Sequence, residues 1–451
     1  MSTPWLDRIA EFAFTLRHED LPAHVLERAH WLLLDGIAVM VAGAREPRVA
    51  ALAAVLKKRG SLGVSAFTTD GSRGDAADAA LVNATAACAH VLDEGHKYAR
   101  GHVGTYVLPA VLAVAEEQRV SCTELITALV VGYEVAARMG MACRVHESMH
   151  PSGTWGTIGA VAATARLMGF TPERIREAMN VAAPLTLATS WKAATQGATV
   201  RDLYSGQGAA NAVMAPRWVE AGFTGSDDDV SHVFGQVVAK HFDTDIASGG
   251  LGQRWEVMRN YFKIHACCRN FQSGIDAALA LRVRYGLSGE DVVAIRADTF
   301  AVPARDNAEA EPANVLAAKE SFPVSLALTL HHGRCDQSVF TEENVAHPEI
   351  ARLAAVAQVR CDPELDARAP EERPTRLTLT LRDGRTVSEY WPVALGDPSR
   401  PLSAEQLEAK FDEAVDGGLG AGRAASIKQV VLGMTPDAPL SSLTRLLEPL
   451  A

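Results

Sequence analysis

The sequence has few aromatic residues and few cysteines. Phenylalanine, tryptophan and tyrosine make up 6% of the 451 residues, and the seven cysteines are scattered, with no C-x-x-C pair among them. This pattern excludes a disulfide scaffold and is typical of a reducing compartment, so we expect a cytoplasmic protein. With 48% hydrophobic and 22% charged residues, the composition also excludes collagen-like and disordered chains.

Basic residues are in the minority. The 43 lysines and arginines are outnumbered by 54 aspartates and glutamates, which gives a formal net charge of -11. Most of the surface would repel a nucleic-acid backbone, so we expect no nucleic-acid partner. A carboxylate ligand is compatible with this charge, because a few cations and amide N–H groups can converge inside a cleft that excludes water.

Long apolar runs are missing too. The N-terminal segment carries Asp7, Arg8 and Glu11 among its apolar residues, which is unlike a signal peptide. No apolar run reaches the roughly 18 residues that cross a bilayer, so we expect no membrane partner.

Several motifs that mark cofactor or hydrolase chemistry are absent. The sequence contains no G-x-x-x-x-G-K-[ST], no G-x-S-x-G, no H-E-x-x-H and no G-x-G-x-x-G after a strand. The glycine-rich residues 417–422 lack the dinucleotide-binding spacing and are interpreted as a short flexible loop. We therefore expect a mechanism without an organic cofactor and without a metal.

Helical periodicity dominates up to about residue 265. Apolar residues recur at helical spacing behind Pro4 and Pro22, and Ser121 with Glu124 forms a capping-box pattern before a long apolar stretch. Alanine and glycine are dense in this part of the chain, which favours helices that pack closely in a thick bundle.

The pattern changes after Gly286. Runs of β-branched or alternating residues follow, and two of them flank Asp383-Gly384, which predicts a β-hairpin. Residues 313–333 and 341–355 are predicted helices between the strands.

Helical patterning returns at Ser403 and Gln406, which form a capping box. We therefore predict a mainly α fold with two domains. A large all-helical domain, residues 1–268 and 399–451, is interrupted by a smaller α+β lid domain, residues 269–398.

Histidines and cations gather in four short polar segments within stretches of small or apolar residues. The segments are residues 90–104, 146–156, 197–206 and 263–269. Three histidines, two carboxylates and two cations in the first segment exceed what solubility requires, because histidine titrates near neutral pH. A hydrated surface loop is the alternative interpretation, and His150 taken alone is equally typical of a capping or core histidine.

The fourth segment holds adjacent Cys267 and Cys268 between Lys263 and Arg269. Zinc and iron–sulfur sites need further ligands at set spacings, and none is nearby in the sequence, so we interpret the cysteines as buried thiols. The two cations, together with Arg201, are candidates to neutralise a di- or tricarboxylate, and ordinary ion pairs are the alternative.

Seven collinear motifs extend over essentially the whole chain. They are HVLDEGH…GHVGTYVLPAVLAVAEE, GYEVAARMG, HPSGTWGTIGAVAATARLMGF, GATVRDLYSG, KIHACCRNFQSGIDAAL, FTEENVAHPEI and PLSAEQLEAKFDE. As a set they resemble the MmgE/PrpD family, which includes 2-methylcitrate dehydratases, cis-aconitate decarboxylases and iminodisuccinate epimerases. The resemblance implies a helical domain with a small α+β lid, a homodimer, and cleavage of a bond beside a carboxylate without metal or organic cofactor.

The resemblance also implies site residues. His102 and His150 match the family's motif histidines, Arg201 and Lys263 match its motif cations, and Asp93 fits one of two registers of its acidic stretch. We therefore expect both histidines, the aspartate and the lysine to be catalytic. The residues expected to bind the substrate are Arg201, His96, Tyr204 and Arg269.

Three positions depart from the family pattern. Val103 stands where proline is usual, Cys268 where cis-aconitate decarboxylases carry a catalytic histidine, and Val324 where many members have tyrosine. The last two departures argue against decarboxylation.

The expected function is dehydration of a small 2-hydroxy di- or tricarboxylate. Removing a proton beside a carboxylate creates a dianionic enolate, so the site needs a base and a cation that gains strength as charge develops. His102 and His150 divide the base and acid roles, and either assignment is open. Epimerisation of an iminodisuccinate-like dicarboxylate is the first alternative, and a noncatalytic carboxylate-binding protein is the second.

Overall fold

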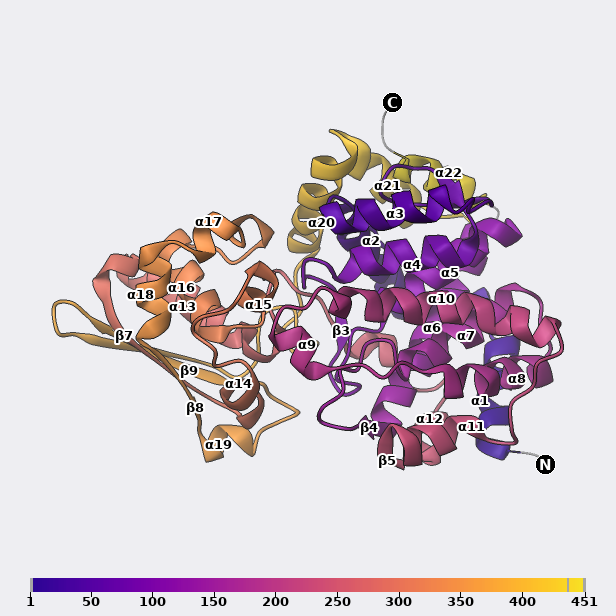
Figure 1. The fold of residues 1–451 in the computed structure, drawn as a ribbon, viewed down its shortest axis with the longest axis horizontal. Helices are drawn as coiled ribbons and strands as arrows, with labels where there is room; N and C mark the ends of the chain where they lie inside the picture. Colours follow the sequence, from indigo (N-terminus) through magenta and orange to yellow (C-terminus); the bar gives the residue numbers. More distant parts are fainter. Residues whose placement is uncertain (1–2, 436–437, 449–451) are drawn as a thin grey trace.

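The large domain is built around one central helix. In the computed structural model, which describes residues 3–435 and 438–448, α6 (Cys122–Ala142) is buried along almost its whole length and packs against α5 and α7. The remaining helices surround this core in Figure 1. They are α1 (Pro4–Thr15), α2 (Ala23–Ala44), α3 (Pro47–Lys58), α4 (Ala76–Cys88), α5 (Gly104–Gln118), α7 (Gly156–Leu167), α8 (Pro172–Ala182), α9 (Trp191–Thr195), α10 (Val200–Glu220), α11 (Asp229–His232) and α12 (Thr244–Ser248).

Small residues bring these helices into close contact. A side chain on Gly43 of α2 would meet the carbonyl oxygen of Ala86 in α4 at 1.8 Å. A side chain on Gly159 of α7 would meet the backbone nitrogen of Ala136 in α6 at 2.3 Å. The density of alanine and glycine therefore serves helix packing, as the sequence predicted.

Helix α6 is also long and apolar enough to cross a membrane by length and composition, and 94% of its apolar window is buried inside the protein. A charged pair lies within it, where Arg138 Nη1 contacts Glu134 Oε2 at 2.5 Å. Its environment is that of the core helix of a folded domain.

The smaller domain contains a four-stranded sheet in the order β10-β9-β7-β8. β7 pairs with β8 in parallel and with β9 antiparallel, and β9 and β10 form the hairpin predicted at Asp383-Gly384. Alternate residues of β9 are buried, because α13, α16 and α18 cover one face of the sheet. The elements of this domain are α13 (Gln272–Tyr285), β7 (Val292–Thr299), α14 (Ala301–Asp306), α15 (Val315–Lys319), α16 (Phe322–His332), α17 (Glu342–Val345), α18 (Pro348–Ala355), β8 (Ala357–Cys361), α19 (Pro363–Asp366), β9 (Thr375–Leu381) and β10 (Thr386–Trp391).

Two of the predicted helices in this domain are each divided in two. Residues 313–333 form α15 and α16, because Ser321 caps a new helix that has a proline in its first turn. Residues 341–355 form α17 and α18, where His347 caps a helix that starts at Pro348. In both cases proline at a helix start interrupts an otherwise continuous pattern.

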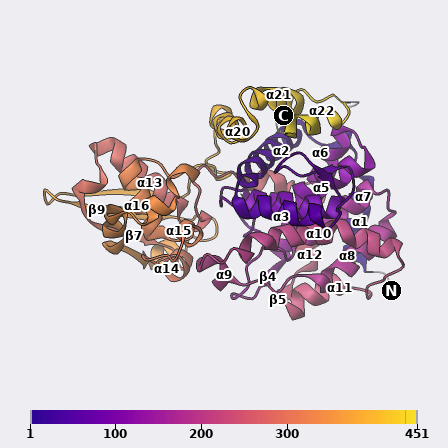
Figure 2. The same ribbon diagram turned by 45° about the horizontal axis from the view of Figure 1, so that its top comes forward.

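After the sheet the chain returns to the large domain through α20 (Ala404–Leu419), α21 (Arg423–Leu432) and α22 (Ser441–Thr444). Figures 1 and 2 show these helices on the large domain, with the sheet domain to one side. The structure therefore confirms the predicted mainly α fold with a smaller inserted α+β domain.

Part of the glycine-rich stretch was wrongly predicted as a loop. Gly417 and Gly418 lie inside α20, and a side chain on Gly418 would meet Cγ1 of Val41 at 2.4 Å. The glycine allows α20 to approach α2 closely, so its role is packing. Only from Gly420, which has a φ of 99°, does the chain leave the helix.

Three two-stranded ladders complete the large domain. β1 (Ser65–Ala66) pairs with β2 (Arg73–Gly74), β4 (Cys143–Val145) pairs with β5 (Ala239–Phe242), and β3 (Gly95–His96) pairs with β6 (Asn260–Tyr261). The last pair matters for function, because it places the first polar segment beside the fourth.

The contact between α2 and α4 gives the first prediction. Gly43→Ala places a methyl group against backbone atoms that cannot move independently, so we expect the free energy of unfolding to fall by about 1 to 3 kcal/mol. Gly417→Ala in α20 is the control, because the nearest described atom that an added methyl would meet outside its own helix backbone is Arg45 Nη1 at 3.4 Å. Urea unfolding checks both variants, and equal stability of the two would contradict the packing argument.

Candidate active site

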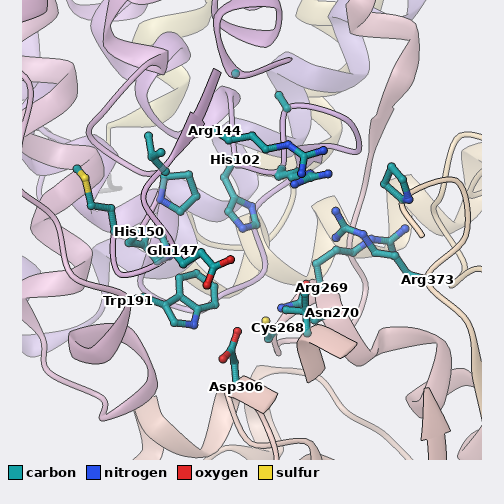
Figure 3. Close-up of a pocket in the computed structure, with 18 of the residues that line it drawn as sticks. His102, Arg144, Glu147, His150, Trp191, Cys268, Arg269, Asn270, Asp306 and Arg373 are labelled. Carbon is teal, nitrogen blue, oxygen red and sulfur yellow. The ribbon is translucent and has the colours of Figure 1, made fainter. Parts of the chain in front are cut away.

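A cavity of about 360 Å³ is lined by residues of both domains. His102, Arg144 and His150 reach it from the large domain, and Asp306 and Arg373 reach it from the small domain (Figure 3). This position is typical of ligand sites, which form preferentially between domains.

The floor of the site is a short loop after α4. Its residue Val91 has a φ of 56°, which is unusual for a β-branched side chain and turns the backbone sharply. Buried side chains donate to its carbonyl oxygens: Lys263 Nζ to that of Val91 at 2.5 Å and Lys410 Nζ to that of Leu92 at 3.1 Å. Lys410 also pairs with buried Asp35. The loop is therefore fixed by lysines from two other parts of the chain.

His102 is oriented by acceptors from this loop. Its Nδ1 lies 2.8 Å from the carbonyl oxygen of Glu94 and 3.0 Å from Oδ2 of Asp93. A carbonyl and a carboxylate only accept hydrogen bonds, so Nδ1 carries the proton of the neutral ring. Nε2 is then left with a lone pair, which is the form required of a general base.

The surroundings of Asp93 and His102 shift the pKa of both groups. Burial favours the neutral acid, but the interaction with the His102 ring and the charges of Lys263 and Arg201 outweigh it and lower the pKa of Asp93. Burial lowers the pKa of His102 to about 4, although Asp93 opposes the shift. The imidazole is therefore neutral and the carboxylate ionised at neutral pH.

His150 is held in the opposite tautomer. Its Nδ1 accepts a hydrogen bond from the backbone N–H of Ser152 at 3.2 Å, and its ring stacks on Trp191 with the centroids 5.1 Å apart. Burial, followed by the charge of Arg201, lowers its pKa well below the usual value. Because the ring is neutral and Nδ1 accepts, Nε2 carries the proton and can donate.

Arg201 is a buried cation whose charge acts on both histidines. It lines the cavity, donates through Nη1 to the carbonyl oxygen of Cys88 at 2.8 Å, and lies 3.9 Å from Glu320 Oε1 through Nη2. Within the described part of the chain its Nε has no hydrogen-bond partner. A buried donor without a partner costs free energy, so this nitrogen is suited to bind an anion from the cavity.

Cys268 and Glu320 occupy the adjoining wall. Burial raises the pKa of the Cys268 thiol well above its usual value, and the thiol donates to the carboxylate of Glu320. The cysteine is therefore a neutral group here. Cys267 is buried as well, and neither cysteine is in a disulfide, as the sequence analysis expected.

Asp93 and two other predicted site residues do not line the cavity. Lys263, predicted to be catalytic, is fully buried behind Asp93, with Nζ 3.4 Å from Oδ1, and does not line the cavity. His96, predicted to bind substrate, is fully buried with Nε2 at 3.3 Å from Glu256 Oε2. Because neither side chain reaches the cavity, the first supports the aspartate and the second supports the fold.

Tyr204, also predicted to bind substrate, lies behind His150. Its hydroxyl accepts from the backbone N–H of Ser190 at 3.1 Å, and its ring centroid is 6.0 Å from that of His150. It is absent from the cavity lining, so it positions the histidine and Trp191 segment. Arg269, the fourth predicted binding residue, does line the cavity.

Sequence analysis missed several cavity residues. Arg100 and Arg144 lie within or beside the predicted polar segments, so their charge was a signal that could have been used. Trp191, Glu320 and Arg373 stand outside those segments, and no pattern in the sequence singles them out. Over residues 3–435 and 438–448, no group of three or more histidine, cysteine, aspartate or glutamate side chains is arranged to hold a metal ion.

Comparison with known proteins identifies the family. Residues 7–245 match the MmgE/PrpD N-terminal domain and residues 265–435 match the MmgE/PrpD C-terminal domain. Relatives include a cis-aconitate decarboxylase of Aspergillus terreus, 26% identical over 97% of this chain and 95% of the relative. Another is the Homo sapiens cis-aconitate decarboxylase, 24% identical over 77% of this chain and 74% of the relative. The chain belongs to the MmgE/PrpD family.

The buried position of Lys263 gives the second prediction. Lys263→Met leaves the carboxylate of Asp93 and the carbonyl oxygen of Val91 without their buried donor, so we expect the free energy of unfolding to fall by about 3 kcal/mol or more. Lys428→Met is the control, because its partners Glu408 and Asp412 are partly exposed, and we expect a loss below about 1 kcal/mol. Equal losses in urea unfolding would contradict a supporting role for the buried lysine.

Proposed function

We propose that this MmgE/PrpD family member is a lyase that removes a proton beside a carboxylate of a small polycarboxylate and expels water. The observation that carries the proposal is the pair of neutral imidazoles on one cavity in opposite tautomers. His102 offers a lone pair and His150 offers an N–H. Together they supply base and hydrogen-bond donor, so the proposal requires no cofactor.

The first step is deprotonation by His102. Nε2 takes the proton from the carbon beside the carboxylate, and the imidazolium that forms is stabilised by Asp93 at 3.0 Å. A base with a pKa of about 4 is weak, so the developing dianion must be strongly stabilised. Arg201 and the Nε2 proton of His150 provide this stabilisation in a site with little water.

The second step is departure of the hydroxyl group. The carbon–oxygen bond breaks as the alkene forms, and the proton held on His102 passes to the leaving hydroxide, which departs as water. Both imidazoles are then neutral again. His150 acts throughout as a neutral donor, a role that suits a histidine whose pKa is far below 7.

Decarboxylation is the second candidate, because the relatives described above are cis-aconitate decarboxylases. Loss of carbon dioxide leaves a carbanion that must receive a proton from the enzyme. His102 is neutral and has a free lone pair on Nε2, so this nitrogen must accept a proton before it can donate one. Cys268, a neutral thiol beside Glu320, stands where the decarboxylases carry histidine. These features favour proton abstraction.

The test uses 2-methylcitrate, citrate, malate and cis-aconitate as substrates in deuterium oxide. We expect an unsaturated acid to form from a hydroxy acid, with its ultraviolet absorbance rising as water is lost. Carbon dioxide release from cis-aconitate would establish decarboxylation instead. Recovery of inverted, deuterated substrate without alkene would establish epimerisation, and no turnover of any substrate would support a binding protein.

Variants of the two histidines give the third prediction. His102→Gln and His150→Gln should each lower turnover at least about 100-fold, because each removes a group that acts on the reacting atoms. Exposed His241 on β5 provides the control, and His241→Gln should leave turnover unchanged. Turnover near that of the wild type in either cavity variant would remove that histidine from the mechanism.

A further inference from the structure

Glu320 differs from the other carboxylates of the cavity in its burial. Among the residues that the structure describes, the carboxylates that line the cavity are those of Glu147, Asp306, Glu320 and Asp366. The side chain of Glu147 is 89% exposed, and Asp306 is neutralised by Arg305, whose Nε lies 2.7 Å from Oδ1. Asp366 is half-buried and accepts from the backbone N–H of Ala301. Glu320 is only 6% exposed, so a ligand in the cavity meets there a carboxylate that bulk water scarcely solvates.

The backbone around Glu320 is fixed on both sides. The residue follows α15 directly, and its carbonyl oxygen accepts from Asn307 Nδ2 at 2.8 Å. The next residue, Ser321, caps α16. The backbone N–H of Cys268, a residue of the cavity wall labelled in Figure 3, donates to the carbonyl oxygen of Lys319 at 2.9 Å. The position of Glu320 in the wall is therefore set before a ligand arrives.

Two groups of the protein face the carboxylate of Glu320. Arg201 Nη2 of the large domain lies 3.9 Å from Oε1, beyond hydrogen-bond distance, and the Cys268 thiol donates a hydrogen bond. Burial raises the pKa of Glu320, and Arg201 and Cys268 oppose the rise. A thiol is a weak donor, and the two oxygens of a carboxylate accept about four hydrogen bonds. The protein therefore leaves Glu320 with acceptor capacity inside the cavity.

A buried carboxylate in a cavity for anions discriminates between ligands. A ligand carboxylate bound at the free Nε of Arg201 lies near Glu320, and two carboxylates at close range repel each other. A hydroxyl group on the ligand offsets this repulsion, because a hydrogen bond to a charged acceptor is stronger than one between neutral groups. A ligand without the hydroxyl leaves the buried carboxylate unpaired, which costs affinity.

We propose that Glu320 accepts a hydrogen bond from the hydroxyl group of the substrate and thereby selects hydroxy acids over polycarboxylates that lack a hydroxyl. The proposal rests on the proposed function, in which a hydroxy acid loses water, and deepens it by naming the residue that recognises the hydroxyl. Donation to Glu320 engages the hydroxyl hydrogen and leaves the lone pairs of the oxygen for the proton that His102 delivers. Glu320 is thus a specificity-determining residue.

The experiment uses two pairs of acids that differ by one hydroxyl group: citrate with tricarballylate, and malate with succinate. Each acid is titrated calorimetrically into His102→Gln protein, which suppresses turnover during the titration, and into the same protein carrying Glu320→Met. With Glu320 present, we expect each hydroxy acid to bind at least about tenfold more tightly than its partner. Glu320→Met should bring the ratio of affinities close to one, and it should tighten the binding of tricarballylate and succinate because a negative charge is removed.

Two further variants on the same background serve as controls. Asp306→Asn alters a cavity carboxylate that Arg305 already neutralises, so the ratio of affinities should not change. Glu320→Gln keeps an acceptor oxygen in a side chain of the same shape and removes the charge. We expect it to retain part of the preference for the hydroxy acids and to bind tricarballylate and succinate more tightly than the protein with Glu320.

Other results overturn the assignment. Equal affinities within both pairs in the presence of Glu320, a preference that survives Glu320→Met, or no binding of any of the four acids would each contradict it. Aspartate that binds more tightly than malate, and loses this advantage with Glu320→Met, would show that Glu320 selects an ammonium group instead. A preference that depends on Glu320, in a protein that turns over no hydroxy acid when His102 is intact, would support the contact while overturning the proposed reaction.

Discussion

The contact between Asp93 and His102 is the constraint on which the site depends. A carboxylate buried in a helical domain is unfavourable unless charges and donors surround it, and here Lys263, Arg201 and His102 do so. In return, the carboxylate and the neighbouring carbonyl of Glu94 determine which imidazole nitrogen carries the proton. The tautomer of the cavity histidine is thus set by groups that do not themselves line the cavity.

The rest of the fold holds this contact in place. The loop at Val91 is anchored by Lys263 and Lys410, and the second of these comes from α20, far along the chain. Glu94 joins the loop to the next helix, because its side chain accepts from the first N–H of α5 and from the hydroxyl of Tyr133 in α6. Burial raises the pKa of Glu94 to about 8, so this link adds little charge to the site. Close helix packing around α6 gives the loop a rigid base.

The sequence allowed the fold class, the hairpin and many helix starts to be predicted, because these follow from periodicity, caps and turns within short segments. It also indicated the segments that meet at the cavity, as His102, His150, Arg201 and Arg269 show. The sequence did not indicate which of the polar side chains in these segments would be buried. Lys263 and His96 lie in equally polar segments, yet packing places them behind the cavity wall. Sequence analysis missed Arg373, because the position of this arginine at the cavity depends on how the two domains pack against each other.

Nitrogen-15 NMR of the imidazole rings tests the central claim most directly. At neutral pH the account predicts that His102 is protonated on Nδ1 and His150 on Nε2, and that His102 gains its second proton only as the pH falls to about 4. The low value follows from burial, which disfavours the charged ring. A His102 protonated on Nε2, or one that titrates near the ordinary histidine pKa of about 6.5, would contradict the account.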